Sequence, residues 1–186
     1  MLIGISGKRG SGKDLLGTIL ASEHGFVRYS FARALKQHVR DFMLLTEEQT
    51  DGGRKEMPTA YEKTDGWFYT PREIMIEVGQ FYRQFDRNFW VRKVLRYAMD
   101  EQNACITDCR FVNEADAIRA AGGVVIRLER KPELNIYKGA IDDATETELD
   151  HYSFDYVLGA DFNLTPADLQ HFAKEIIADT NAKTMV

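Results

Sequence analysis

The sequence has few residues that could cross-link the chain or hold a metal, and it has no long apolar run. It contains two cysteines and four histidines among 186 residues. The two cysteines, Cys105 and Cys109, are too few for a disulfide-stabilised scaffold, and neither they nor the histidines have the spacing of a zinc site. No stretch approaches the ~20 apolar residues that cross a membrane, and no signal-peptide pattern is present. We therefore expect a cytoplasmic protein with reduced thiols and no membrane contact.

The sequence also lacks an excess of positive charge. Lysine and arginine number 24 against 29 aspartates and glutamates, which gives a net charge of −5. Without a basic stripe, broad binding of polymeric nucleic acid is disfavoured, whereas a small nucleotide needs only a local cationic pocket. The apolar content of 44% and the charged content of 28% are ordinary for a globular protein, and the length suits one domain over residues 1–186.

A glycine-rich stretch with the sequence Gly-Lys-Arg-Gly-Ser-Gly-Lys-Asp occupies residues 7–14. It follows an apolar run at 2–6, typical of a buried strand, and precedes residues 15–20, whose apolar side chains have helical spacing. Strand, loop and helix form the context that a G-x-x-x-x-G-K phosphate loop requires. The glycines allow backbone N–H groups to form an anion site, and Lys13 adds a cation for the β- and γ-phosphates. A basic surface turn is the alternative, and the context favours the phosphate loop.

Asp14 stands where a serine or threonine usually contacts Mg²⁺ in such loops. A carboxylate there leaves three alternatives open. It contacts the metal directly, it contacts it through water, or it only adds a favourable negative charge to the first turn of the helix.

Five short apolar runs predict strands, at 2–6, 26–30, 104–107, 124–128 and 156–158, with helical segments between them. This pattern predicts an α/β fold, a P-loop NTPase-type three-layer sandwich in which helices cover both faces of a five-stranded parallel sheet. We expect the core at residues 1–32, 102–128 and 154–186, a helical acceptor-binding insertion at 33–101, and a lid at 129–150.

Within the insertion, Thr70-Pro71-Arg72-Glu73 is a strong helix start, with an N-cap, a proline at the first helical position and a capping-box glutamate. The spacing of Ile74, Val78 and Phe81 predicts that these side chains face inward. Another helix is expected from about Asn88, and the polar stretch from Asp51 to Tyr69 is expected to be irregular.

Cations follow the predicted strands and line the insertion, where an enzyme that transfers phosphoryl groups must position two anions. Each alone is also read as a solvated surface charge, so the hypothesis depends on their clustering. They are Arg33, Lys36, Arg72, Arg83, Arg110, Arg127 and Arg130. Asp108, directly after an apolar strand, is either a metal-orienting carboxylate or a turn cap. The acidic run at 142–148 is either a solvated face or a set of groups that bind on closure of the lid.

These motifs resemble those of the bacteriophage deoxynucleoside monophosphate kinases. Residues 6–14 resemble that family's phosphate loop, which also has aspartate after the lysine, and residues 107–114 resemble its strand-three motif. Residues 70–73, with Gly79, Arg83 and Phe89-Trp90, are similar to its acceptor-side helices. Thr147-Glu148, Leu149 and Asp155 fall where the family has a Ser-Glu pair and a later aspartate.

The resemblance implies transfer of the ATP γ-phosphoryl group to a deoxynucleoside monophosphate, with ATP and Mg²⁺ as cofactors. It implies that Arg110 and Arg130 bridge donor and acceptor. Two departures concern Leu15, where many relatives have threonine, and Ala160, where an asparagine often follows the last strand.

Motif, charge and resemblance together give the candidate residues. They are Gly7, Arg9, Gly10, Ser11, Gly12, Lys13 and Asp14 for the nucleotide; Arg33, Lys36, Arg72, Arg83, Trp90, Asp108 and Glu148 for the substrate; Lys13, Arg110 and Arg130 for catalysis; and Asp14 and Asp108 for the metal.

The alternatives to this interpretation concern the acceptor, the class of protein and the oligomeric state. Animal phosphomevalonate kinase has a similar phosphate loop and a similar acidic stretch, so another small phosphate is a possible acceptor. Aromatic and amide groups on the acceptor helices, such as Gln80, Phe81, Tyr82 and Trp90, favour a nucleobase, although apolar residues of helices more often form a core. A nucleotide-dependent switch is disfavoured because residues 108–111 lack its Asp-x-x-Gly motif. A homodimer is neither required nor excluded.

Overall fold

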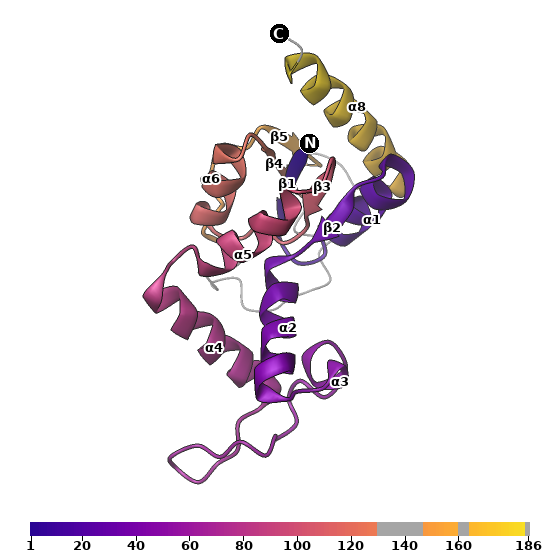
Figure 1. Ribbon diagram of the computed structural model, residues 1–186. Coiled ribbons are helices and arrows are strands. Elements are labelled where there is room, and N and C mark those ends of the chain that lie inside the picture. The colour runs from indigo at the N-terminus through magenta and orange to yellow at the C-terminus, as the bar shows by residue number, and fades with distance from the viewer. Residues whose placement is uncertain (130–146, 160–163, 185–186) are drawn as a thin grey trace. The chain divides into compact units, whose positions relative to one another are not determined.

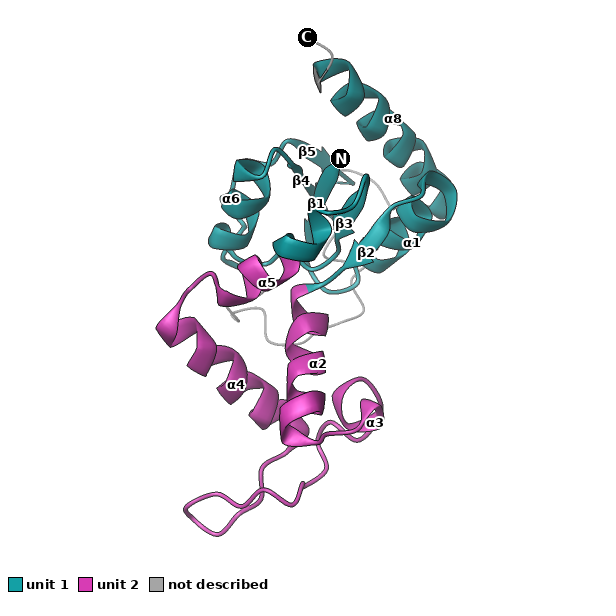
Figure 2. Cartoon of the chain, in the orientation of Figure 1, with its two compact units in different colours: residues 1–30, 95–186 teal, residues 31–94 magenta. Residues whose placement is uncertain are grey.

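The structure is a computed structural model that describes residues 1–129, 147–159 and 164–184 (Figure 1). The chain forms two compact units (Figure 2). Unit 1 consists of residues 1–30 and 95–186, and unit 2 of residues 31–94.

A five-stranded sheet forms the centre of unit 1. Its strands are β1 (Leu2–Gly7), β2 (Val27–Tyr29), β3 (Ala104–Ile106), β4 (Val124–Leu128) and β5 (Tyr156–Leu158). They lie in the order β2-β3-β1-β4-β5, and every neighbouring pair is parallel. All six residues of the central strand β1 are buried. The predicted parallel sheet is therefore confirmed.

Helices cover both faces of this sheet, as the sequence predicts. Ile3 and Ile5 of β1 share a core with Leu16 of α1 (Lys13–His24) and Leu169 of α8 (Pro166–Thr184). The intervening Gly4 faces α6 (Val112–Ala120), because a side chain built there would meet Ile118 at 2.7 Å. Since successive residues of a strand point to opposite faces, α1 and α8 lie on one face and α6 on the other (Figure 1).

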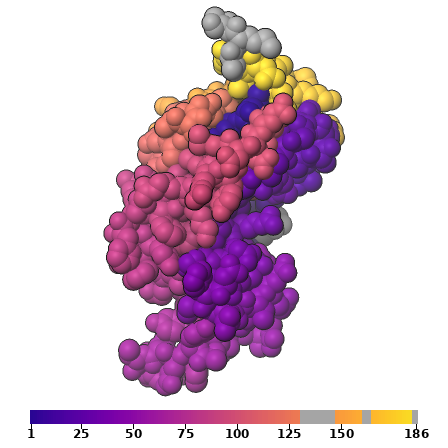
Figure 3. Space-filling view, in the orientation of Figure 1, coloured from indigo at the N-terminus to yellow at the C-terminus, as the bar shows by residue number. Residues whose placement is uncertain are grey.

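The final helix α8 packs beside the helix that follows the glycine-rich loop. Its predicted apolar residues Leu169, Phe172 and Ile176 are buried. In the space-filling view the surface of α8, in yellow, adjoins that of α1, in purple (Figure 3). The start of α1, where the phosphate loop ends, is thus backed by a second helix.

Unit 2 is helical and contains α2 (Phe31–Met43), α3 (Glu47–Thr50), α4 (Pro71–Phe85) and the start of α5 (Phe89–Ala98). The predicted start of α4 is confirmed. The Thr70 hydroxyl accepts from the Glu73 N–H at 3.3 Å, and the Glu73 carboxylate accepts from the Thr70 N–H at 2.8 Å. A hydrogen bond from Lys63 and the Thr70 N–H hold the pKa of Glu73 at about 2.

Residues 51–69 contain no helix, as expected, but the backbone hydrogen-bonds back onto itself. Glu62 and Phe68 form an antiparallel bridge. The Thr59 N–H donates to Tyr69 O and the Tyr69 N–H to Tyr61 O, both at 2.8 Å. The segment is therefore a loop between α3 and α4 that is closed by its own backbone hydrogen bonds.

The inward prediction for α4 is correct for Ile74, which is buried, and wrong for Phe81, which is 51% exposed. Phe81 instead contacts the edge of Phe85 on the same helix, with ring centroids 4.9 Å apart. Helical spacing shows which residues share a face but not how wide the covered face is.

Among the described residues, no helix is long and apolar enough to cross a membrane.

We expect Thr70→Ala to lower the free energy of unfolding of the protein by about 1 kcal/mol, because the substitution leaves the first turn of α4 without its side-chain cap. Urea denaturation followed by circular dichroism measures this change. Thr64→Ala, at an exposed position six residues earlier, is the control and should stay within about 0.5 kcal/mol of the wild type. Equal effects of the two substitutions would contradict the capping assignment.

Candidate active site

The glycine-rich loop connects the end of β1 to the start of α1, as the sequence predicts. Gly7, Gly10 and Gly12 have φ angles of 150°, 82° and 100°, which residues with a side chain rarely adopt. Gly12 is the N-cap of α1, and its carbonyl accepts from the Leu16 N–H at 2.9 Å. The chain thus enters the helix directly from the loop, which places the helix N-terminus at the loop.

Lys13 folds back over this loop. Its ammonium group donates to the carbonyl oxygens of Gly7 at 2.5 Å and Lys8 at 2.8 Å. The residue is only 8% exposed, so the cation is held against the backbone of the loop's first two residues. The loop therefore holds one buried positive charge at the helix N-terminus, where anions are favoured.

The hydroxyl of Ser11 is buried and has no hydrogen-bond partner among the described residues. A buried hydroxyl without a partner is costly, and such groups in functional sites often await a ligand. A side chain at Gly7 would come within 2.5 Å of both this hydroxyl and Leu128 O, so only glycine fits beside it. A spare donor, a cation and a helix N-terminus fit the phosphates of a nucleotide.

The two remaining loop candidates, Arg9 and Asp14, lie on the surface. Arg9 is exposed at the tip of the loop. The Asp14 side chain is 93% exposed, and its carboxylate lies 3.5 Å from the guanidinium of Arg28. A role for Asp14 at a metal stays a prediction.

Asp108 follows β3, the strand beside β1. The Cys109 N–H donates to Ile5 O at 3.1 Å, which ties this turn to the central strand. The Asp108 carboxylate accepts from the Ser30 hydroxyl at 2.8 Å. Ser30 follows β2, so the carboxylate lies beyond the carboxyl ends of the strands, where parallel α/β sheets bind ligands. Its metal role stays a prediction, and the described part of the chain contains no cluster of three or more His, Cys, Asp or Glu residues suited to a metal.

Two carboxylates cap the start of α6, which follows Arg110. Glu114 accepts from the N–H groups of Arg110 and Phe111 at 2.8 and 3.1 Å. Glu148, a candidate substrate residue, accepts from the Val112 N–H at 3.0 Å. The observed contact of Glu148 is therefore with the helix, and its contact with substrate stays a prediction.

Sequence reasoning missed Asp150, which joins the phosphate loop to β4. Its carboxylate accepts from Lys8 of the loop at 2.9 Å and from Arg127 of β4 at 2.8 Å. Burial alone would raise the pKa of Asp150, but the hydrogen bonds and charges of the two cations outweigh this and hold it below its ordinary value. An arginine within the buried strand 124–128 was the available signal, because a buried guanidinium needs a carboxylate partner.

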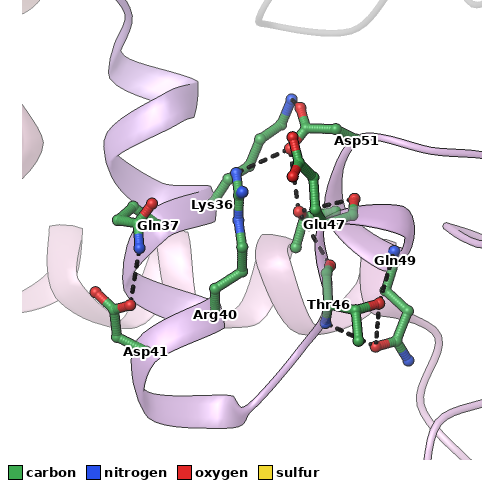
Figure 4. Close-up of polar contacts among 9 residues, drawn as sticks. Lys36, Gln37, Arg40, Asp41, Thr46, Glu47, Gln49 and Asp51 are labelled. Atoms are coloured by element: carbon green, nitrogen blue, oxygen red, sulfur yellow. Dashed lines mark hydrogen bonds and ion pairs between the residues drawn. The ribbon is translucent and has the colours of Figure 1, made fainter.

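In unit 2, Lys36 belongs to a cluster of charges (Figure 4). Lys36 and Arg40, one turn apart on α2, donate to the two oxygens of Asp51 at 2.6 and 2.9 Å. Burial would raise the pKa of Asp51, but the hydrogen bond from Lys36 and the charge of both cations lower it. The cluster has two cations for one carboxylate, and the Arg40 Nε is buried without a partner among the described residues.

The four other candidate residues of unit 2 have different surroundings. Arg72 pairs with Glu56 on the surface. Arg33 is exposed on α2, and the Arg83 guanidinium lies 3.4 Å from where a side chain at Gly79 would begin. Trp90 is 2% exposed, and its indole N–H donates to Gly79 O at 3.3 Å. Its observed role is packing, and its assignment to substrate stays a prediction.

Three sequence predictions fall outside the described residues. They concern Arg130, Ala160 and most of the expected lid.

No protein-family model matches the chain. The fold is similar to that of solved kinases. Shikimate kinase from Aquifex aeolicus superposes with a TM-score of 0.55 and 15% identity over 100% of this chain and 99% of that one. Dephospho-CoA kinase from Campylobacter jejuni gives a TM-score of 0.54 and 14% identity over 96% of each chain. At these identities the likeness shows the fold alone, and that fold is the P-loop kinase fold.

Sequence similarity gives the family. The chain is 34% identical over 149 residues to a protein of Acanthamoeba polyphaga mimivirus named "Putative deoxynucleotide monophosphate kinase". The match covers 70% of this chain and 74% of the viral protein. With the phosphate loop in place between β1 and α1, this similarity shows that the chain belongs to the deoxynucleotide monophosphate kinase family.

Proposed function

We propose that this protein transfers the γ-phosphoryl group of ATP to a deoxynucleoside monophosphate and forms the diphosphate. The observation that carries the proposal is the phosphate loop, with Lys13 held over it and Ser11 left with a spare hydroxyl. The resemblance of residues 70–73 and 107–114 and the name of the viral relative support a nucleotide as acceptor.

Unit 1 binds the donor in this proposal. Backbone N–H groups of the loop, the Ser11 hydroxyl and Lys13 bind the β- and γ-phosphates, and Arg9 adds a cation at the loop tip. Mg²⁺, when bound, would neutralise part of the phosphate charge. Asp108 is the candidate to orient it, because the carboxylate is held by Ser30 beyond the strand ends, and Asp14 is the second candidate.

Unit 2 contributes the residues that bind the acceptor phosphate. That phosphate is already ionised near neutral pH, so the reaction demands no general base. Positioning and neutralisation of charge are therefore the main tasks, and arginine suits them because its planar fork matches phosphate oxygens. The proposed acceptor residues are Arg33, Lys36, Arg72 and Arg83, with Arg110 and Arg130 serving both phosphates.

A substrate panel tests the proposal. ATP and Mg²⁺ are supplied with each deoxynucleoside monophosphate, each ribonucleoside monophosphate, shikimate or phosphomevalonate, and ADP release is measured. We expect turnover with one or more deoxynucleotides. Turnover only with phosphomevalonate or another small phosphate would keep the kinase and replace its substrate, and no turnover with any acceptor would overturn the proposal.

Lys13→Ala should lower the rate of phosphoryl transfer by at least about 100-fold, because the cation that offsets charge on the transferred group is removed. A coupled assay for ADP measures the rate, and far-ultraviolet circular dichroism shows that the fold is retained. Lys174→Ala, on the exposed side of α8, serves as the control. A Lys13→Ala protein with full activity would remove the role of the loop.

Ser11→Ala should separate stability from nucleotide binding. The substitution removes a buried hydroxyl that has no partner in the nucleotide-free protein, so the free energy of unfolding should stay the same or rise by about 1 kcal/mol. ATP affinity, measured by calorimetry, should fall several-fold because a phosphate oxygen loses a donor. Unchanged affinity would show that this hydroxyl does not face the nucleotide.

Arg72→Ala and Arg83→Ala should raise the KM for the acceptor or lower kcat by about tenfold or more, while the Kd for ATP stays within about twofold. Initial-rate kinetics with the acceptor varied, together with calorimetry for ATP, measure the two effects. Arg54→Ala removes another exposed arginine of unit 2 and is the matched control. Parallel losses in ATP affinity would place these arginines outside the acceptor site.

A further inference from the structure

The carboxylate of Asp150 connects the first half of the phosphate loop to β4. Asp150 lies 2.9 Å from the ammonium of Lys8 and 2.8 Å from the guanidinium of Arg127. Arg127 also donates to the hydroxyl of Ser6 at 3.3 Å, and Ser6 is the residue that precedes the loop. The peptide units of residues 6–8 are thus held through Ser6 on one side and through Lys8 on the other.

These peptide units carry the oxygens that hold Lys13. The ammonium of Lys13 binds Gly7 O at 2.5 Å and Lys8 O at 2.8 Å. Any shift of the 7–8 backbone therefore moves the cation that faces the phosphates. Misplacement of a reacting or stabilising group by about 1 Å can cost a large part of the rate.

The backbone that carries Asp150 is itself fixed to unit 1. The Asp150 N–H donates to Thr147 O at 2.9 Å. Five residues later, Asp155 pairs with Arg119 of α6 at 3.0 Å and accepts from the Val125 N–H of β4 at 2.7 Å. Between them, Tyr152 donates to Asp116 of α6 at 2.9 Å. Asp150 is therefore presented to the loop from a backbone anchored on β4 and α6.

The guanidinium of Arg127 is buried, and a buried charge is costly unless it is paired. The Arg127 side chain is 8% exposed, and its partner carboxylate also binds Lys8, in the loop that we propose holds the phosphates. Glu129 lies 3.9 Å from the same guanidinium, so the two cations face two carboxylates and the group is close to neutral. An unpaired carboxylate there would repel the nucleotide. The arrangement thus uses an acidic residue to hold the loop without making the loop acidic.

We propose that Asp150 is a positioning residue of the phosphate loop, which acts through Lys8 and Arg127 to fix the backbone that holds Lys13. Asp150 touches neither ATP nor acceptor in this role. The inference rests on the proposed kinase function for its catalytic readout, but its main test is ATP binding without any acceptor.

Two single substitutions test the role because simple charge effects give them opposite signs. Lys8→Met removes a positive charge and Asp150→Asn removes a negative one, so charge alone predicts weaker ATP binding for the first and tighter binding for the second. Loss of positioning predicts weaker binding for both, by about threefold to tenfold, and a fall in kcat on the order of tenfold or more. Calorimetry with ATP and initial rates measure these changes.

Urea unfolding midpoints and the ATP affinity of a double variant distinguish a positioning role from a purely structural one. Lys8→Met leaves the Arg127–Asp150 pair intact and should leave the urea unfolding midpoint nearly unchanged, because a half-exposed ion pair contributes little. Lys8→Arg should recover most of the lost affinity. The Lys8→Met/Asp150→Asn double variant should bind ATP no more weakly than Asp150→Asn alone, because the two residues act as one unit.

Asp155→Asn is the matched control, since it removes a carboxylate from the same segment, at a position that contacts Arg119 and Val125 but not the loop. It should lower stability and leave ATP affinity unchanged. Tighter ATP binding by Asp150→Asn, additive losses in the double variant, or a loss of stability without a loss of affinity would each overturn the proposal. If no acceptor is turned over, the proposed kinase function is wrong. The ATP affinities of the variants still decide the role of Asp150 in that case.

Discussion

The contact of the Lys13 ammonium with two carbonyl oxygens of its own loop is the interaction on which the candidate site depends. It forms only because β1 ends and α1 begins within a few residues, and that distance is set by the burial of β1 in the sheet and of α1 beneath α8. Glycines with left-handed angles make the turn possible, and the close approach of Leu128 O to Gly7 leaves no room for a side chain there. The chemistry of the loop is thus a product of the packing of the whole of unit 1.

Carboxylates of the same chain pair with several of the candidate cations and with cations beside them. Lys36 and Arg40 bind Asp51, Arg72 binds Glu56, and Lys8 and Arg127 bind Asp150. Such pairs keep long side chains ordered and lower the local charge when no nucleotide is bound. In the proposed function, a phosphate that binds these cations would compete with, or add to, an existing carboxylate, so part of its binding energy would be an exchange of anions.

Local signals account for the parts of the structure that the sequence predicts well. The capping box at residues 70–73, the glycine-rich loop and the apolar runs of the strands each act over a few neighbouring residues, and each lies where expected. The order of the strands and the pairing of Asp150 with Arg127 arise from contacts between distant segments, which no local pattern encodes. Phe81 shows the limit of periodicity, since helical spacing places it on the apolar face while the fold leaves it exposed. For the site, the loop was predictable in detail, but the partners that hold its cations were not.

Both tryptophans of the chain, Trp67 and Trp90, belong to unit 2. Trp67 is 74% exposed and Trp90 is 2% exposed, with its indole hydrogen-bonded inside a group of aromatic rings. Tryptophan fluorescence, excited selectively, therefore reports on the helical unit and not directly on the nucleotide loop. A soluble quencher would reach exposed Trp67 and spare buried Trp90, so spectra with and without quencher distinguish solvent access at residues 51–69 from loosening of the helical interior.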